Sequence, residues 1–144
     1  IKYRKKIVVS THPRTQKKLD LKNFKITNIK FCKPFNYTDY MFLQINSFFV
    51  LSDSGSITEE ASICNFNAIN LRKNHERPEG MEEGGTIMNS LDIKNAENAI
   101  KVMLNSEKSK IVSDYDVDNV SDKIVKIVTS YYNYINNYVW KKNI

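Results

Sequence analysis

A turn of small hydroxylated residues, Ser54-Gly55-Ser56, stands between a short apolar run and a segment of helical composition. In a strand-turn-helix arrangement, the first backbone N–H groups of the helix lack partners and point toward one spot. Gly55 permits close approach of the backbone, and the hydroxyls of Ser54 and Ser56 add donors, so a phosphate fits there. An ordinary capped helix start explains these residues equally well.

Two carboxylates follow the turn. Glu60 is expected at the mouth of the same site, where a carboxylate can accept hydrogen bonds from both ribose hydroxyls of a nucleotide. The alternative is a glutamate on a solvated helix surface. The spacing Ser56-x-x-Glu59 matches a capping box, which predicts that the Ser56 side chain caps the helix.

A charged segment, residues 72–80, follows the next apolar run. Loops after parallel strands lie at the carboxyl edge of the sheet, where ligands bind in open α/β folds. A guanidinium there could face a diphosphate, with Glu76 and Glu79 orienting it. The residues alone favour a solvated loop with incidental ion pairs, and His75 is expected to face solvent.

His12 directly follows the first apolar run and precedes Pro13 and Arg14. It therefore shares the carboxyl edge with the two segments above, which places it where a ligand is expected. A single histidine is more often structural than catalytic.

Short apolar runs alternate with amphipathic segments, which predicts βα units and a parallel sheet. The apolar run 48–51 is typical of a central strand covered on both faces. Asp92 is expected to cap a helix, and residues 72–84 are expected to form a loop. The expected strands are 7–10, 29–31, 48–51, 68–71 and 85–88, and the expected helices are 14–20, 38–46, 57–62, one from Asp92 and one from about Asn119.

Composition narrows the class of protein. The 144 residues suit one domain, and Cys32 and Cys64, far from any metal-ligand pattern, are expected to be buried in a reducing compartment. No stretch reaches the ~20 apolar residues of a membrane span, so no membrane association and a cytoplasmic location are expected. A net charge of +6 suggests nucleic-acid binding. The basic residues are concentrated in the first thirty positions, however, and a solvated face explains them better.

The final segment carries aromatic residues between Tyr131 and Trp140 at helical spacing. Such residues could stack on bases, but aromatics at this spacing more often form a core or a docking face. We therefore expect a docking helix over about 119–140.

Three stretches together resemble the non-hydrolysing UDP-N-acetylglucosamine 2-epimerase family. They are STHPRT at 10–15, DSGSITEEA at 53–61 and ERPEGMEEG at 76–84, in the family's order and spacing. The ending SYYNYINNYVWK at 130–141 is similar to the branch that makes UDP-N-acetyl-L-fucosamine.

The resemblance implies an α/β fold with a Rossmann-like parallel sheet, the second half of a glycosyltransferase-B type fold. It implies that the phosphates of a UDP-sugar lie against residues 54–56 and that its ribose meets Glu60. Arg77 lines the same pocket and the ring of Tyr40 borders the uracil. His12 lies near the cleft, where bacterial members use a histidine for a regulatory UDP-sugar site.

By resemblance, the full enzyme inverts C2 of a UDP-N-acetylhexosamine by eliminating and readding UDP, with no metal or redox cofactor. Ser56 departs from the family pattern, which has a second glycine here, and its Cβ lies beside the phosphates. The acids that move the C2 proton lie in the amino-terminal half of the family and have no match in this sequence.

We therefore expect residues 1–144 to be a UDP-binding carboxy-terminal domain that needs a missing amino-terminal domain or a complementary chain. The alternative is a non-catalytic UDP-binding module or decayed gene product. Nucleic acid ranks last among the partners, and a homodimer is a further candidate assembly.

Overall fold

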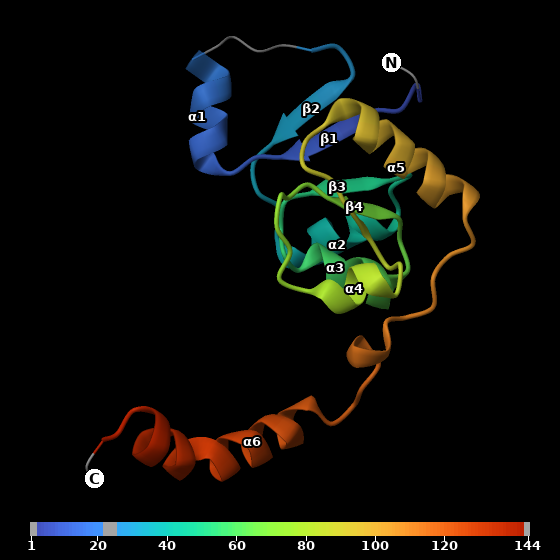
Figure 1. Cartoon of the computed structure of the whole chain (residues 1–144). Helices are drawn as coiled ribbons and strands as arrows, with labels where there is room; N and C mark the ends of the chain where they lie inside the picture. Colours follow the sequence, from blue (N-terminus) through green and yellow to red (C-terminus); the bar gives the residue numbers. More distant parts are fainter. Residues whose placement is uncertain (1–2, 22–25, 143–144) are drawn as a thin grey trace. The chain divides into compact units, whose positions relative to one another are not determined.

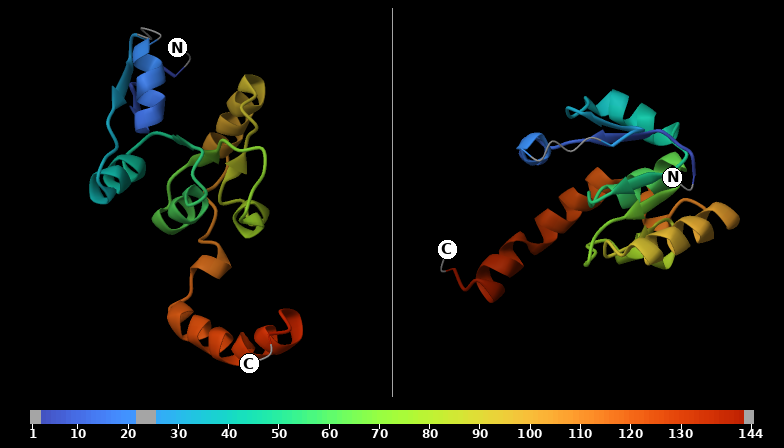
Figure 2. Two further views of the ribbon diagram at one scale, coloured as in Figure 1. Left: turned by 90° about the vertical axis from the view of Figure 1, so that its left-hand side faces the viewer. Right: turned by 90° about the horizontal axis from the view of Figure 1, so that it is seen from above.

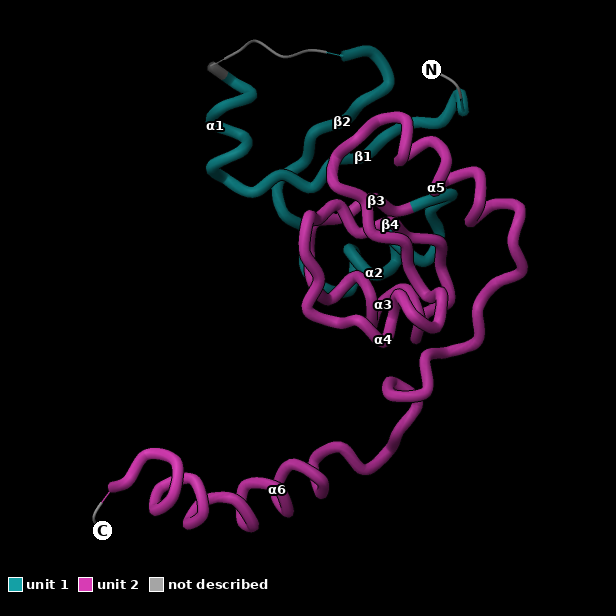
Figure 3. Tube along the Cα trace, in the orientation of Figure 1, with its two compact units in different colours: residues 1–49 teal, residues 50–144 magenta. Residues whose placement is uncertain are grey.

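The computed structural model describes residues 3–21 and 26–142 (Figure 1). The chain divides into two compact units, residues 1–49 and 50–144 (Figure 3). Parallel strands joined by helices make up both units, as the α/β prediction requires. Among the described helices, none is both long and apolar enough to cross a bilayer.

The first unit is a two-stranded parallel sheet with two helices. Strand β1 (Ile7–Ser10) pairs in register with β2 (Ile29–Cys32), and α1 (Pro13–Leu21) lies between them in the chain. Helix α2 (Tyr37–Ile45) follows β2, and the side chain of its N-cap, Asn36, accepts a hydrogen bond of 2.8 Å from a backbone N–H. The strands and helices expected here are confirmed to within a residue or two.

The second unit contains a three-stranded parallel sheet of order β3-β4-β5. Strand β4 is buried along its whole length, and the small core gathers around it and α3. The elements in chain order are β3 (Val50–Ser52), α3 (Ile57–Cys64), β4 (Ala68–Asn70), α4 (Pro78–Glu82), β5 (Ile87–Met88) and α5 (Ile93–Asn105). The core side chains are Ile57, Ala61, Phe66, Ala68, Ile69, Ala99 and Val112.

The apolar run 48–51 is not the central strand that we expected. Only its second half enters β3, which lies at the edge of its own sheet, and Leu51 is 53% exposed. The middle position belongs to β4, whose sequence is less apolar. An apolar run indicates a tendency to be buried but does not encode the order of strands in a sheet.

A short helix, α4, occupies part of the segment expected to be a loop. Pro78 stands in its first turn, where the missing N–H would have no helical partner and the fixed φ suits a helix. Gly80 lets α4 lie against α3, because a Cβ built there would come within 2.0 Å of the Thr58 methyl carbon Cγ2. This close contact sets the position of Arg77, the N-cap residue of α4.

The carboxy-terminal part continues from α5 through a 3₁₀ turn, η1 (Ser113–Tyr115), to α6 (Val120–Tyr134) and the π-helical turn η2 (Ile135–Val139). The start of α6 after Asn119 confirms the predicted helix, and Figure 2 shows α6 and η2 continuing one another. No side chain of α6 is buried.

Two smaller expectations have different outcomes. The cap on α5 is confirmed, because Asp92 Oδ1 accepts a hydrogen bond of 2.8 Å from the Asn95 N–H. The expectation that both cysteines are buried is wrong, since Cys32 and Cys64 are free and only half-buried. Cys32 lies in a two-stranded sheet, which is too small to cover it on both faces.

Candidate functional site

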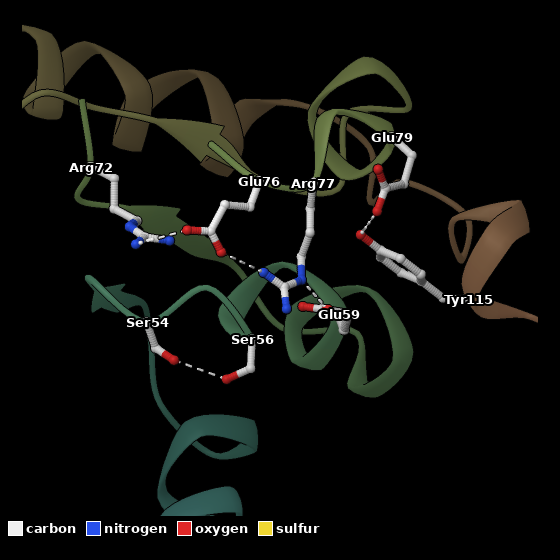
Figure 4. A network of polar contacts seen from close by, with 8 residues as sticks. All are labelled: Ser54, Ser56, Glu59, Arg72, Glu76, Arg77, Glu79 and Tyr115. Carbon is white, nitrogen blue, oxygen red and sulfur yellow. Dashed lines mark hydrogen bonds and ion pairs between the residues drawn. The ribbon is translucent and has the colours of Figure 1, made fainter. Parts of the chain in front are cut away.

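The site forms at the carboxyl ends of β3 and β4, which are paired in parallel. The turn after β3 and the charged segment after β4 therefore reach the same edge of the sheet, as expected for ligand sites in open α/β folds. Figure 4 shows the side chains that meet there.

The turn holds two hydroxyls close together. Ser54 Oγ and Ser56 Oγ are 2.9 Å apart, and Ser56 Oγ donates a hydrogen bond of 2.8 Å to Glu60 Oε1. Within the described part of the chain, the backbone N–H groups of Gly55, Ser56 and Ile57 have no hydrogen-bond acceptor. These donors stand at the start of α3, where the helix dipole favours an anion.

The capping-box prediction for this turn is wrong. Ser56 has helical dihedrals (φ −65°, ψ −12°), and its side chain makes no capping hydrogen bond. A capping serine needs an extended backbone so that its oxygen can reach back to a helix N–H. Ser56 instead bonds Glu60, one turn along, and Glu59 bonds an arginine.

Two guanidinium groups converge on Gly55. A Cβ built on Gly55 would lie 2.7 Å from Arg77 Nη1 and 3.3 Å from Arg72 Nη1. Arg77 extends from the start of α4 and Arg72 from the segment after β4, and the side chain of each is 32% exposed. The absence of a side chain at Gly55 thus leaves room for both cations beside the backbone donors of the turn.

Carboxylates hold the two arginines in place. Glu59 Oε1 pairs with Arg77 Nε, and this hydrogen bond is the chief reason that the pKa of Arg77 is raised above its ordinary value. Glu76 lies between the two guanidinium groups, with Oε1 3.4 Å from Arg72 Nη2 and Oε2 3.5 Å from Arg77 Nη1. The expected role of Glu76 beside a guanidinium agrees with this geometry, while the role of Glu59 was not anticipated.

Glu79 does not hydrogen-bond an arginine, contrary to expectation. Its Oε1 accepts a hydrogen bond of 2.8 Å from the hydroxyl of Tyr115, a residue that sequence reasoning missed. The pKa of Glu79 is lowered by a hydrogen bond from its own backbone N–H and then by the Tyr115 hydroxyl. Burial, followed by the bond to Glu79, raises the pKa of Tyr115.

The segment that carries Tyr115, residues 109–115, braces α4 and its neighbours. The backbone N–H and the hydroxyl of Ser113 both donate to the carboxylate of Glu83, at 3.1 and 2.8 Å. Val112 is fully buried and its N–H donates to Ser62 Oγ at 2.9 Å. These contacts and the Tyr115 bond fix both ends of α4, and hence Arg77, from one side.

His12 and Tyr40 belong to the first unit. His12 is exposed at the end of β1, and its Nδ1 accepts a hydrogen bond of 3.2 Å from the Arg14 N–H. Tyr40 lies half-buried on α2. The roles of both residues toward a ligand stay predictions. His75 is exposed, as expected.

Parallel strands, a glycine turn at a helix start and two facing guanidinium groups define an α/β unit of the anion-binding kind. Comparison with known proteins gives the family. The UDP-N-acetylglucosamine 2-epimerase family matches residues 1–129, and the chain belongs to that family.

Individual relatives agree with this assignment. The UDP-N-acetylglucosamine 2-epimerase of Methanocaldococcus jannaschii is 34% identical over 134 residues, and that of Methanococcus maripaludis is 36% identical over 114 residues. These matches cover 88% and 74% of this chain but only 36% and 31% of the relatives. The chain thus spans about a third of the length of these curated relatives.

Solved structures give the same result. The Rickettsia bellii UDP-N-acetylglucosamine 2-epimerase matches with 45% identity and a TM-score of 0.75, over 94% of this chain and 39% of that one. The Methanocaldococcus jannaschii enzyme in complex with UDP-GlcNAc and UDP matches with 34% identity and a TM-score of 0.76, over 89% and 36%. These matches confirm the α/β, Rossmann-like fold class of the glycosyltransferase-B type.

Proposed function

We propose that this chain is the UDP-binding carboxy-terminal part of a UDP-N-acetylglucosamine 2-epimerase. The observation that carries the proposal is the convergence of Arg72 and Arg77 on Gly55, beside backbone donors at the start of α3. A related enzyme has been crystallised with UDP-GlcNAc and UDP, which supports a ligand with two linked phosphates.

The proposed ligand contacts follow from the chemistry of the turn. The phosphates lie against residues 54–56, where N–H groups, hydroxyls and guanidinium groups all donate hydrogen bonds to phosphate oxygens. The ribose hydroxyls donate to Glu60, which the Ser56 hydroxyl already orients toward the turn. Tyr40 beside the uracil and His12 near the cleft, where bacterial members have a regulatory UDP-sugar site, complete the proposed set.

The reaction itself needs groups beyond those of this chain. Epimerisation at C2 by loss and return of UDP requires a base and an acid placed over the sugar ring. The four candidate carboxylates near the turn already have partners. Glu59 pairs with Arg77, Glu60 accepts from Ser56, Glu76 lies between the two arginines and Glu79 bonds Tyr115.

We therefore propose that the acid and base come from the remaining two thirds of the protein or from a complementary chain. A non-catalytic UDP-binding module is the second candidate, because the same geometry serves binding alone. The fucosamine branch, a homodimer and a cytoplasmic location stay predictions of the same proposal.

Two measurements test the proposal on the chain as it stands. Calorimetric titration should show saturable binding of UDP and weaker binding of ADP, whose base differs while its diphosphate is the same. Incubation with UDP-N-acetylglucosamine in deuterated water should give no deuterium at C2 above the protein-free control. Absence of UDP binding would refute the proposed function, and deuterium incorporation would show that a catalytic base lies among the residues assigned here to binding.

A further inference from the structure

We propose that Arg72 is a second phosphate-binding residue and that Glu76 is an internal stand-in for the ligand, displaced from between the two arginines when a diphosphate binds. This inference rests on the proposed function and specifies which side chains hold the two phosphates. The sequence predicts that a guanidinium of residues 72–80 faces a diphosphate without singling out Arg72, and it describes Glu76 only as an orienting group.

Arg72 has the position that a phosphate ligand requires. Its Nη1 would lie 3.3 Å from a Cβ on Gly55, so it shares with Arg77 the space directly above the turn. The guanidinium is part-exposed and can therefore meet a ligand from solvent. Two guanidinium groups at one turn can each donate to one phosphate of a diphosphate, so a ligand with two phosphates can bridge them.

Space for the second phosphate lies beside Arg72. An open hollow of about 500 Å³ is lined by Asp53, Leu71, Arg72, Lys73, Asn74 and Glu76. It borders the Gly55 turn through Asp53 and the guanidinium of Arg72. A ligand held by its first phosphate at the turn thus has this hollow beside it for the second phosphate.

The carboxylates of Glu59 and Glu76 differ in how firmly they are held. Glu59 is part-buried, and its Oε1 pairs closely with Arg77 Nε, while Nη1 of that arginine lies toward Gly55. Glu76 is 66% exposed, and its contacts to the two arginines are long, at 3.4 and 3.5 Å. Exposed, long ion pairs contribute little to stability. A more highly charged anion can therefore replace Glu76 beside the arginines, but it cannot replace Glu59.

Charge balance explains why a stand-in is useful. Two arginines face two carboxylates, which offset the repulsion between the guanidinium groups across Gly55. When Glu76 swings into solvent, one positive charge is released to meet the diphosphate. The cost of uncovering it lowers the affinity for any small anion that cannot bridge both arginines.

The test compares UDP, UMP and uridine by calorimetry on the wild type, Arg72→Ala, Arg72→Lys, Glu76→Gln and the control Lys101→Ala. Lys101 is exposed on α5 and does not line the hollow, so its loss removes one positive charge outside the proposed phosphate site. Arg72→Ala should lower the affinity for UDP by at least about tenfold and the affinity for UMP by less. Arg72→Lys should restore only part of the UDP affinity. Glu76→Gln should raise the affinity for UDP by about three- to tenfold and leave the affinity for uridine unchanged.

Each contrary outcome has a separate meaning. If the wild type does not bind UDP, the proposed function fails and this inference fails with it. If UDP binds but Arg72→Ala matches the wild type, or the control Lys101→Ala weakens UDP binding as much as Arg72→Ala does, only the role of Arg72 is refuted. Weaker UDP binding by Glu76→Gln would show that Glu76 orients the arginines and is not a stand-in for the ligand. Circular dichroism of each variant confirms that the fold is kept.

Discussion

Gly80 is the position at which the packing of α4 against α3 can be tested most directly. An alanine Cβ there would lie 2.0 Å from Thr58 Cγ2 and 3.2 Å from the Tyr115 hydroxyl oxygen. Thr58 is fully buried on α3 and cannot swing away. We therefore expect Gly80→Ala to move α4 outward by about 1 Å or more, until the carbon atoms regain ordinary contact distance.

The magnitude follows from two opposing effects. Forcing an extra methyl group into a filled contact costs about 1–3 kcal/mol, while alanine in place of glycine inside a helix returns about 1 kcal/mol. We expect a net loss of about 1–2 kcal/mol in the free energy of unfolding. Because Arg77 caps α4, its guanidinium should also retreat from Gly55, and UDP affinity should fall by about tenfold.

Urea unfolding followed by circular dichroism, together with UDP calorimetry, measures both effects. The matched control is Thr58→Ser, which deletes Cγ2 and keeps the hydroxyl, and which by itself should cost about 1 kcal/mol for the lost buried methyl group. The double variant Gly80→Ala/Thr58→Ser should be no less stable than Thr58→Ser, because the clashing atom is gone. Purely additive losses, or a Gly80→Ala chain as stable as the wild type, would refute this account of the contact.

Three further outcomes are expected. Glu60→Ala should weaken UDP binding by about ten- to a hundredfold because a charge-assisted pair to the ribose is lost, and equal calorimetric affinities would exclude that role. The wild type should be more stable than Tyr115→Phe below about pH 10, and this difference should decline above that pH. The reason is that the raised pKa keeps the Tyr115 hydroxyl protonated in the folded chain, while the same hydroxyl ionises in the unfolded chain. Urea unfolding across that pH range measures the decline. The wild-type chain should bind a hydrophobic dye through the exposed apolar residues of α6, and Ile124→Ser/Val128→Ser should reduce the fluorescence while Lys126→Ser should not.

Local signals in the sequence were sufficient for most of the elements. The strand at residues 7–10 and the Asp92 cap depend on a few neighbouring residues, and the structure confirms both. Helix α4 was missed because Pro78 was taken as a loop residue, although proline is also favoured in the first turn of a helix. The capping box failed because it depends on the backbone conformation of Ser56, which the residue type does not determine.

The site was predictable only in part. The segments after β3 and β4 meet because parallel strands end at one edge, which the alternating pattern already implied. The partners of individual carboxylates depend on tertiary distances, so sequence reasoning paired Glu79 with an arginine and missed Glu59. Tyr115 lies in a polar stretch with no periodicity, so nothing in its neighbourhood indicated a contact with α4.

The brace formed by residues 109–115 determines how far the chain can be shortened. Ser113 and Tyr115 reach Glu83 and Glu79 from beyond α5, so a truncation at the end of α5 would remove the support of the helix that presents Arg77. Helix α6, which buries none of its side chains, lies outside that support. We therefore expect the smallest chain that keeps Arg77 in place to end just after Tyr115, and deletion or exchange of α6 to leave the proposed phosphate site undisturbed.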